Sequence, residues 1–160
     1  MPDLIQTMPA KDVVSARLAY CYATINGDRF LLMMAKNLKA EAKKNKKTVD
    51  ILGQTASGHK STGWEGTGSM TIYSVTSKFT QLLKQYQDTA EDVYFDMQIV
   101  NEDKTSASGR QTIILKNCNM DSAVIAAFDA SGDWLEQDID FTFEAFEIPE
   151  AFKELDGVRA

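Results

Sequence analysis

Apolar and polar residues alternate along most of this chain with the period of two that is typical of β-strands, because successive side chains of a strand point to opposite faces. The clearest alternation runs from Trp134 to Phe146, with mostly core residues on one face and a row of acids on the other. Asn26-Gly27 is a strong hairpin signal, because both turn positions need a positive φ. The predicted strands are Arg17–Ile25, Arg29–Ala35, Leu38–Lys43 (a half-exposed strand or arm), Val49–Leu52, Ser69–Val75, Val93–Ile99, Gln111–Asn117, Ala123–Phe128 and Trp134–Phe146.

One segment instead has the period of an α-helix. Between Ser77 and Gln87, four apolar side chains recur at i, i+3, i+4 and i+7 and form a single stripe. A helix this short needs a sheet to pack against. One such helix and about eight strands predict a mainly β fold, a small β-barrel or sandwich with one packed α-helix. The stripe consists of Phe79, Leu82, Leu83 and Tyr86.

A glycine-rich segment separates the two middle strands. We predict a loop from Gly53 to Ser69, which is long for a compact domain, and glycine loses the most backbone freedom when it is ordered. We therefore expect neighbouring copies of the same protein to order this loop. The segment holds Gly53, Gly58, Gly63, Gly66 and Gly68.

The charge of the chain is strongly polarised. Its net charge is −6, yet six lysines face one acid between Lys36 and Lys47, whereas eleven acids face one base between Asp121 and Asp156. Such polarity suits head-to-tail association, the alternative being that both runs are solvated faces. The acidic balance disfavours a specific nucleic-acid binder.

Length and composition favour one soluble domain. The 160 residues suffice for a sizeable core, which we place at 17–150, between an N-terminal extension at 1–16 and a C-terminal tail at 151–160. No apolar run approaches the roughly 20 residues that span a bilayer, and the start does not resemble a signal peptide, so a cytosolic protein is the default. Cys21 and Cys118 indicate neither disulfides nor zinc and are interpreted as buried small apolar residues.

Candidate catalytic chemistry is weak. The segment Gly53–Ser61 resembles a phosphate loop, but His59 is inserted before Lys60 and a β pattern follows where a helix should begin. His59 is the single histidine and lacks a nucleophile motif nearby. The acids of the last strand lie along one face, as a solvated stripe does, rather than on two sides of a cleft. We expect no enzyme activity, no cofactor and no metal.

Trp64 lies within the glycine-rich segment. A tryptophan on a loop is either an interface anchor or a lid that folds back over its own barrel mouth, and the sequence leaves both alternatives open.

Two blocks of the chain, in combination, resemble a known family. The middle block comprises Val49-Asp50-Ile51-Leu52-Gly53, Gly58-His59-Lys60, Gly63, Gly66-Thr67-Gly68 and Tyr73-Ser74-Val75-Thr76-Ser77-Lys78-Phe79; Tyr94-Phe95 with Gln98 and the ending Phe141–Glu150 also fit. These residues are similar to those of the tail tube (core tail) proteins of contractile phage tails, in particular the XkdM-like group of PBSX-type prophages. The likeness covers roughly residues 15 to 150 and leaves the first residues without a match.

The resemblance implies a structural virion protein. It implies a β-barrel subunit that forms hexameric rings stacked into a hollow tail tube, a virion component assembled in the bacterial cytoplasm. It implies sheath, tape-measure, baseplate and tail-terminator proteins as partners, and transient passage of DNA through the bore. The alternatives are the tube of an R-type bacteriocin or a type VI-like particle and, from another class, a small β-barrel ligand binder or enzyme.

Two sets of residues are candidates for roles in such a tube. Long extensions are the natural contacts between subunits or rings, and a face of carboxylates that repels phosphate is a natural lining for the lumen. The contact candidates are Lys39, Lys43, Lys44, Gly58, His59, Lys60, Trp64 and Gly66, and the lumen candidates are Glu136, Asp138, Asp140 and Glu144.

Overall fold

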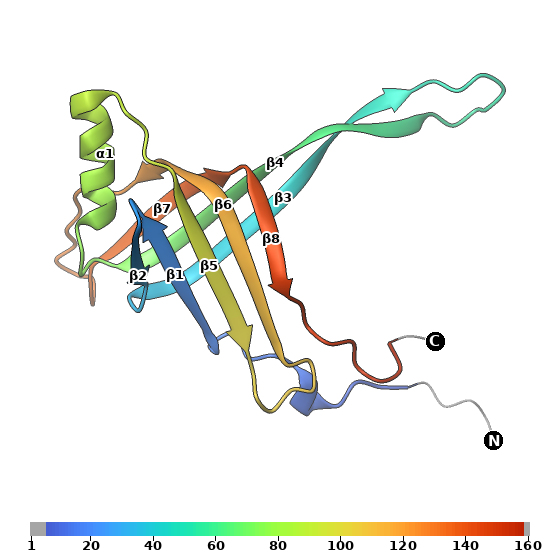
Figure 1. The fold of residues 1–160 in the computed structure, drawn as a ribbon, viewed down its shortest axis with the longest axis horizontal. Helices are drawn as coiled ribbons and strands as arrows, with labels where there is room; N and C mark the ends of the chain where they lie inside the picture. Colours follow the sequence, from blue (N-terminus) through green and yellow to red (C-terminus); the bar gives the residue numbers. More distant parts are fainter. Residues whose placement is uncertain (1–5, 159–160) are drawn as a thin grey trace.

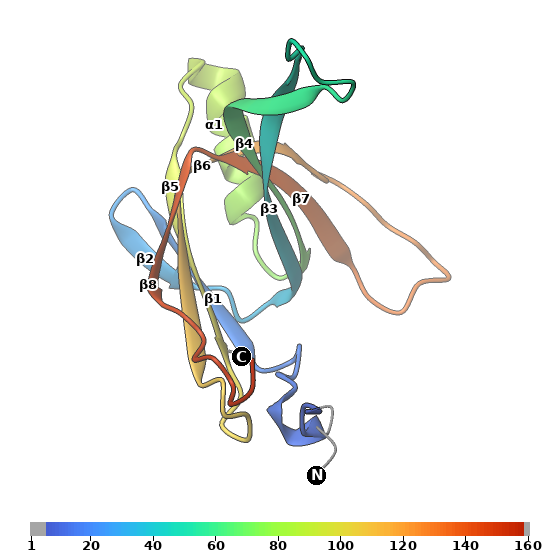
Figure 2. The ribbon, with the colours of Figure 1, turned by 90° about the vertical axis from the view of Figure 1, so that its right-hand side faces the viewer.

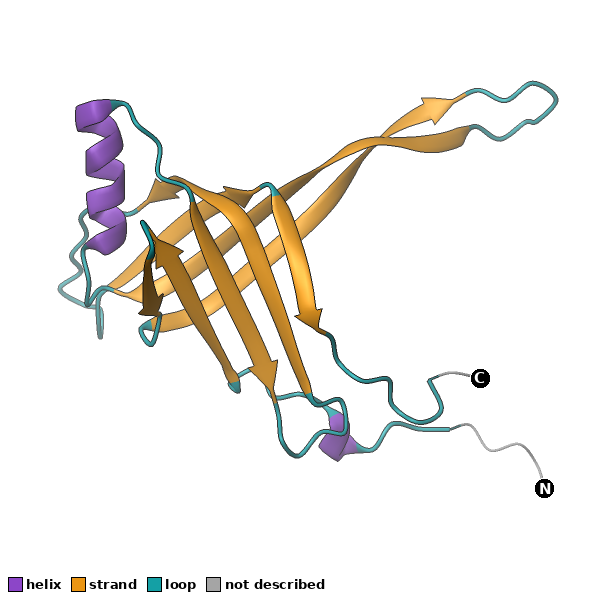
Figure 3. Cartoon of the chain, in the orientation of Figure 1, coloured by secondary structure: helices purple, strands orange, loops and turns teal. Residues whose placement is uncertain are grey.

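The chain folds into one antiparallel sheet that is bent into two layers around a core, with a single α-helix at one end (Figures 1 and 3). The computed structural model describes residues 6–158. Its elements are a 3-10 turn (Ala10–Asp12), β1 (Ala19–Ile25), β2 (Asp28–Leu31), β3 (Ala35–Val49), β4 (Gly58–Tyr73), α1 (Lys78–Thr89), β5 (Phe95–Glu102), β6 (Arg110–Ala123), β7 (Glu136–Phe143) and β8 (Ala145–Glu150).

The strand order β2-β1-β5-β6-β7-β4-β3 explains the two layers. The long strand β6 belongs to both, because its first part pairs with β8 and its last part pairs with β7. β7 and β8 follow one path along β6 and are separated only at Glu144, where the chain bends. The backbone N–H of Glu144 still donates to the Lys116 carbonyl at 3.1 Å. The predicted strand Trp134–Phe146 is therefore confirmed in outline, with a corner.

The sheet is not closed into a barrel. Among the described residues, β2 and β3 end the strand path and do not pair with each other, and Figure 2 shows the two layers diverging. The prediction of a mainly β, sandwich-like fold with one packed helix is confirmed. The Asn26-Gly27 hairpin is confirmed as well, with φ of 52° and 84° at its two turn residues.

The core lies between the layers and is closed at one end by α1. Phe79 and Leu82 of the helix are buried against side chains from both layers, as the predicted apolar stripe requires. Both cysteines are buried, and desolvation raises the pKa of each thiol to about 12, so they act as small apolar residues. The core also contains Ala23, Ile25, Met70, Ile72, Phe95, Met97, Leu115, Ile139, Phe141 and Phe143.

Three element predictions are wrong. The predicted strand Val49–Leu52 keeps only Val49 in a strand, at the end of β3, and residues 50–52 belong to the loop that follows. The predicted loop Gly53–Ser69 is mostly β4, whose pairing with β3 runs from Ala35–Ile72 out to Val49–Gly58, and only residues 50–57 form the connecting loop. The predicted strand Ala123–Phe128 is instead a loop, because β6 ends at Ala123 and its bond with β7 continues only through the Val124 N–H to the Asp138 carbonyl. Pro149 does not end the last strand but lies within β8.

The start of the described chain is held by the β5–β6 turn. Asp12 accepts a hydrogen bond from the Ala107 N–H at 3.0 Å, and Ser106 donates its hydroxyl to the Asp12 carbonyl at 2.7 Å. Asp103 accepts from the Ser15 N–H at 3.1 Å. The N-terminal extension predicted at 1–16 is thus tied down over residues 12–15, and residues 1–5 lie outside the described part.

Candidate assembly surfaces

A long hairpin formed by β3 and β4 projects far beyond the folded body (Figures 1 and 2). The pairing of β4 with β7 covers only Gly66–Tyr73. Within residues 6–158, positions 58–65 of β4 therefore pair with β3 alone. A two-stranded ribbon is marginally stable on its own, so the outer half of this hairpin lacks the support that the body receives.

Most of the predicted contact residues lie on this projecting hairpin. Lys39, Lys43 and Lys44 are on β3, and the β4 candidates pair with that strand. Gly58 pairs with Val49, His59 with Thr48 and Lys60 with Lys47, while Trp64 pairs with Lys44. Residues 43–60 carry five lysines and one aspartate, so the outer hairpin is strongly basic.

The tip of the hairpin is apolar as well as basic. Leu52 is fully exposed, and Val49 and Ile51 are more than 40% exposed. Three aliphatic side chains on one exposed tip are a feature of a surface that another molecule covers.

At its base the hairpin is braced by aromatic rings that lie directly on glycine backbone. A Cβ added to Gly66 would run into the ring of Phe143, and one added to Gly68 into the ring of Phe141. The two glycines therefore permit β4 to cross these rings closely, which is why a glycine-rich sequence is a strand here. Gly66 is thus placed in packing at the base, and Lys39 lies beside Ser69 within the body, whereas the other candidates lie farther out along the hairpin.

Trp64 has features of both alternatives that the sequence left open, a lid on its own domain and an exposed interface anchor. Its ring packs on Phe143 and Phe146, with centroid distances of 6.1 and 5.8 Å, at the open edge between the layers. It nevertheless remains 42% exposed at the start of the unsupported ribbon. The side chain therefore covers its own domain with one face and presents the other to solvent.

The acidic face of β7 lies on the outside of the layer formed by β7, β4 and β3. Asp138 accepts a hydrogen bond from the Thr71 hydroxyl at 2.8 Å, and Asp140 accepts one from the Ser122 hydroxyl at 3.2 Å. Register puts Thr71 beside Asp138, Ser69 beside Asp140 and Thr67 beside Thr142. The β7 and β4 part of this outer face is therefore lined by small hydroxyl side chains and carboxylates, and Lys39 of β3 lies beside it, next to Ser69.

The other two acids of the set have local partners. Glu136 accepts hydrogen bonds from Lys36 Nζ at 2.8 Å and from the Trp134 indole N–H at 2.6 Å. The hydrogen bond from Lys36 lowers the pKa of Glu136, with a further contribution from Trp134. Glu144 lies at the corner after β7 and accepts from the Asn117 amide at 3.2 Å. The four predicted acids thus do not form one uniform row.

A second exposed apolar surface lies on the β6–β7 loop and was missed by the sequence analysis. Phe128 is 97% exposed, and Ile125 and Trp134 are both more than 60% exposed. The apolar residues of this segment suggested a core strand. The strand-like pattern stops at Phe128, where a polar segment with a glycine begins, and this was the only signal in the sequence for a surface loop. We name residues 124–135 the β6–β7 loop.

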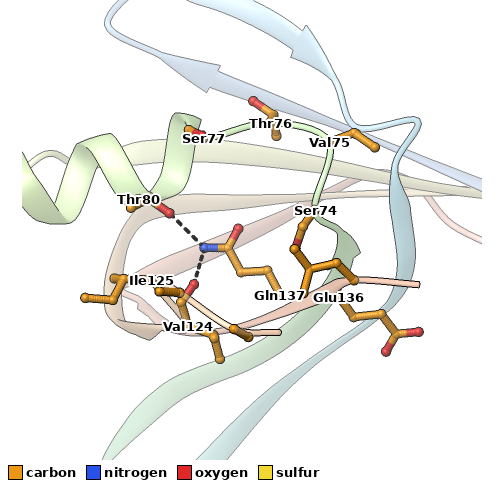
Figure 4. Close-up of a pocket in the computed structure, with 12 residues that line it drawn as sticks. Ser74, Val75, Thr76, Ser77, Thr80, Val124, Ile125, Glu136 and Gln137 are labelled. Carbon is orange, nitrogen blue, oxygen red and sulfur yellow. Dashed lines mark hydrogen bonds between the residues drawn. The ribbon is translucent and has the colours of Figure 1, made fainter. Parts of the chain in front are cut away.

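A cavity of about 410 Å³ opens between this loop and the start of α1 (Figure 4). The buried Gln137 amide lies at its floor and donates to the Val124 carbonyl at 2.7 Å and to the Thr80 hydroxyl at 3.0 Å. These bonds fix the loop to both β7 and the helix. Val75, Ile125 and Leu135 supply apolar walls.

Within residues 6–158 there is no group of three or more His, Cys, Asp or Glu side chains arranged to hold a metal ion. None of the helices in that range is both long and apolar enough to cross a membrane.

Open sheet edges among the described residues, a projecting basic hairpin and exposed apolar patches at two ends are features of the class of proteins that assemble as subunits. Comparison with known proteins gives the family. The family model described as "Phage tail tube protein" matches residues 6–150. The chain belongs to this family of phage tail tube proteins, which confirms the resemblance found in the sequence.

Individual relatives agree with the family. The protein XkdM of the phage-like element PBSX of Bacillus subtilis is 44% identical over 115 residues, 72% of this chain and 78% of that protein. A chain in the six-fold symmetrised baseplate of the anti-feeding prophage has the same fold, with a TM-score of 0.65 over 89% of this chain and 97% of that one, at 10% identity. A chain of the sheath-tube complex of the extracellular contractile injection system PVC matches with a TM-score of 0.63 over 89% and 94%, at 11% identity.

Proposed function

We propose that this chain assembles into hexameric rings that stack into the inner tube of a contractile phage tail, through which DNA is delivered into the host cell. Family membership supports a tube subunit. The observation that carries the proposal is the projecting β3–β4 hairpin, whose outer strands, among the described residues, pair only with each other.

Ring closure requires two different, complementary surfaces on each subunit. Here the free edges of β2 and β3 offer unpaired backbone groups to neighbouring sheets. The hairpin extends the contact area and carries the candidates Lys39, Lys43, Lys44, Gly58, His59, Lys60 and Trp64, while Gly66 holds its base in place.

The outer face of β7, β4 and β3 is the candidate lining of the lumen. Its carboxylates Asp138 and Asp140 repel phosphate within about one Debye length, ~8 Å, and short hydroxyl side chains of β4 lie beside them. Glu136 and Glu144 remain part of this proposed lining, although each is engaged by a neighbouring side chain.

The partners follow from the tube. Relatives of the same fold occur in a sheath-tube complex and in a baseplate, which supports sheath and baseplate proteins as partners of this chain. We add a tape-measure protein, a tail terminator and transient DNA, with assembly in the bacterial cytoplasm and residence in the virion. The role is structural rather than enzymatic.

A second candidate is the tube of a bacteriocin or injection particle, which uses the same fold without DNA. This second candidate is supported by the chains of the same fold in the anti-feeding prophage and in the PVC injection system. Neighbouring genes decide between the two, because only a DNA-carrying phage needs capsid and packaging genes beside the sheath and tape-measure genes.

Negative-stain electron microscopy of the purified chain at high concentration tests the tube itself. We expect annuli and hollow rods. A protein that stays monomeric under all conditions, also when co-produced with its sheath protein, would contradict the proposal.

A further inference from the structure

Two of the apolar surfaces that the described residues expose lie at opposite ends of the molecule. The hairpin tip with Ile51 and Leu52 is at one end of the long axis, and the β6–β7 loop lies near α1 at the other end (Figure 1). A chain with such surfaces at its two ends cannot cover both by itself. Two copies placed head to tail bring the surfaces together, which is the geometry of a heterologous contact.

The charges of the two surfaces are complementary. The hairpin between residues 43 and 60 holds five lysines and one aspartate. The β6–β7 loop holds Asp129 and Asp133 and no basic residue. Asp129 accepts hydrogen bonds from the N–H and hydroxyl of Ser131, at 3.0 and 2.9 Å, so its carboxylate is held in place.

The acceptor also has room for an aliphatic tip. The cavity beside the loop, about 410 Å³, falls within the usual range of binding pockets, roughly 300–1,000 Å³, and has the apolar walls Val75, Ile125 and Leu135. A smaller cavity, lined by Leu82, Tyr86 and Met120 among others, measures about 130 Å³. Because hollows of about 410 and 460 Å³ also lie beside β4 and near the start of the described chain, position and charge, rather than volume, single out the cavity at the β6–β7 loop.

From this complementarity we propose that the hairpin tip of one subunit docks on the β6–β7 loop of a second copy, with Ile51 and Leu52 covering Ile125 and Phe128 and with the hairpin lysines beside Asp129 and Asp133. This inference rests on the proposed tube and names the acceptor for its hairpin. It also gives the β6–β7 loop a role, because its fixed bonds through Gln137 preform the acceptor before assembly.

Chemical crosslinking of assembled rods tests the contact. Leu52→Cys and Phe128→Cys both change fully or almost fully exposed side chains, and the native Cys21 and Cys118 are buried and remain unreactive. Rods of the double variant are treated with a short bismaleimide and analysed on a denaturing gel. We expect a ladder of crosslinked species beyond the dimer, because a heterologous contact links each chain to two neighbours.

The matched control joins Leu52→Cys to Tyr86→Cys, which places the second thiol on α1 beside the smaller cavity. Two thiols that the contact holds side by side react at an effective concentration of millimolar or more. The thiols of the control pair are not held together in the proposed contact, so we expect about tenfold less crosslinked product. Rods that form normally but give no ladder with Phe128→Cys, or a ladder only with Tyr86→Cys, overturn the acceptor while leaving the tube intact. Failure of the unchanged chain to form rods contradicts the tube itself.

Discussion

At the scale of single residues, Gly66 and Gly68 hold the junction between the body and the hairpin. Both lie under phenylalanine rings of β7, and neither has room for a Cβ. Their requirement is one of space rather than of backbone conformation, since neither has a positive φ. The same residue type that predicted a loop from sequence therefore stabilises a strand in the fold.

This packing gives the first prediction. Gly68→Ala forces the Phe141 ring out of its place in the core, and overpacking of this kind costs about 1–3 kcal/mol. We expect a corresponding loss in the free energy of unfolding, measured by urea denaturation of the monomer. Ser69→Ala, at the adjacent exposed position, should leave the midpoint almost unchanged; equal stability of both variants would show that the ring moves without cost.

The Lys36–Glu136 pair gives a pH-dependent prediction. The pKa of Glu136 is lowered in the fold, so the contribution of the pair is present above the usual value near 4.5 and is lost as the pH falls through the lowered pKa. We expect Glu136→Gln to have a slightly lower thermal midpoint than the unchanged chain at pH 7, because exposed pairs stabilise little. The difference should vanish near pH 2, and a difference that persists there would contradict the assignment to ionised Glu136.

At the scale of elements, the segments with regular patterns were predicted well and those with mixed signals were not. The stripe of Phe79 and Leu82 gave α1, and the alternation after Trp134 gave β7. The glycine-rich β4 was missed because the residues that make it a strand, the rings of Phe141 and Phe143, are more than 70 positions away in sequence. The β6–β7 loop was missed because its apolar side chains serve a surface rather than the core. The sequence pointed to the basic and acidic candidate residues by their charge. It could not show which residues lie beside them, because that depends on the register between strands.

The hairpin itself gives a prediction about dynamics. Within the described chain, the strand residues 45–49 and 58–63 pair only with each other and are joined by the loop 50–57, whereas Gly66–Tyr73 lie in a three-stranded sheet. In the unassembled chain we expect hydrogen exchange to be at least tenfold faster in the outer half, because its opening requires no disruption of the core. Assembly into rods should remove that difference. Uniform protection of the whole hairpin before assembly would contradict the proposal that neighbours order it.

At the scale of the whole molecule, basic residues concentrate on one surface and acidic residues on another, which the net charge alone does not show. Basic residues gather on the hairpin that we propose as the contact with other subunits, while the β7 strand of the proposed lumen face carries Asp138 and Asp140. We therefore expect Asp138→Lys with Asp140→Lys to leave tube length unchanged in electron micrographs and to slow DNA ejection severalfold, because phosphates then bind the wall. Glu91→Lys with Asp92→Lys makes the same change in net charge on the exposed connection after α1 and should leave ejection unaffected. If the two double variants eject DNA at the same rate, the acidic face does not line the bore, and it faces the sheath or a neighbouring ring instead.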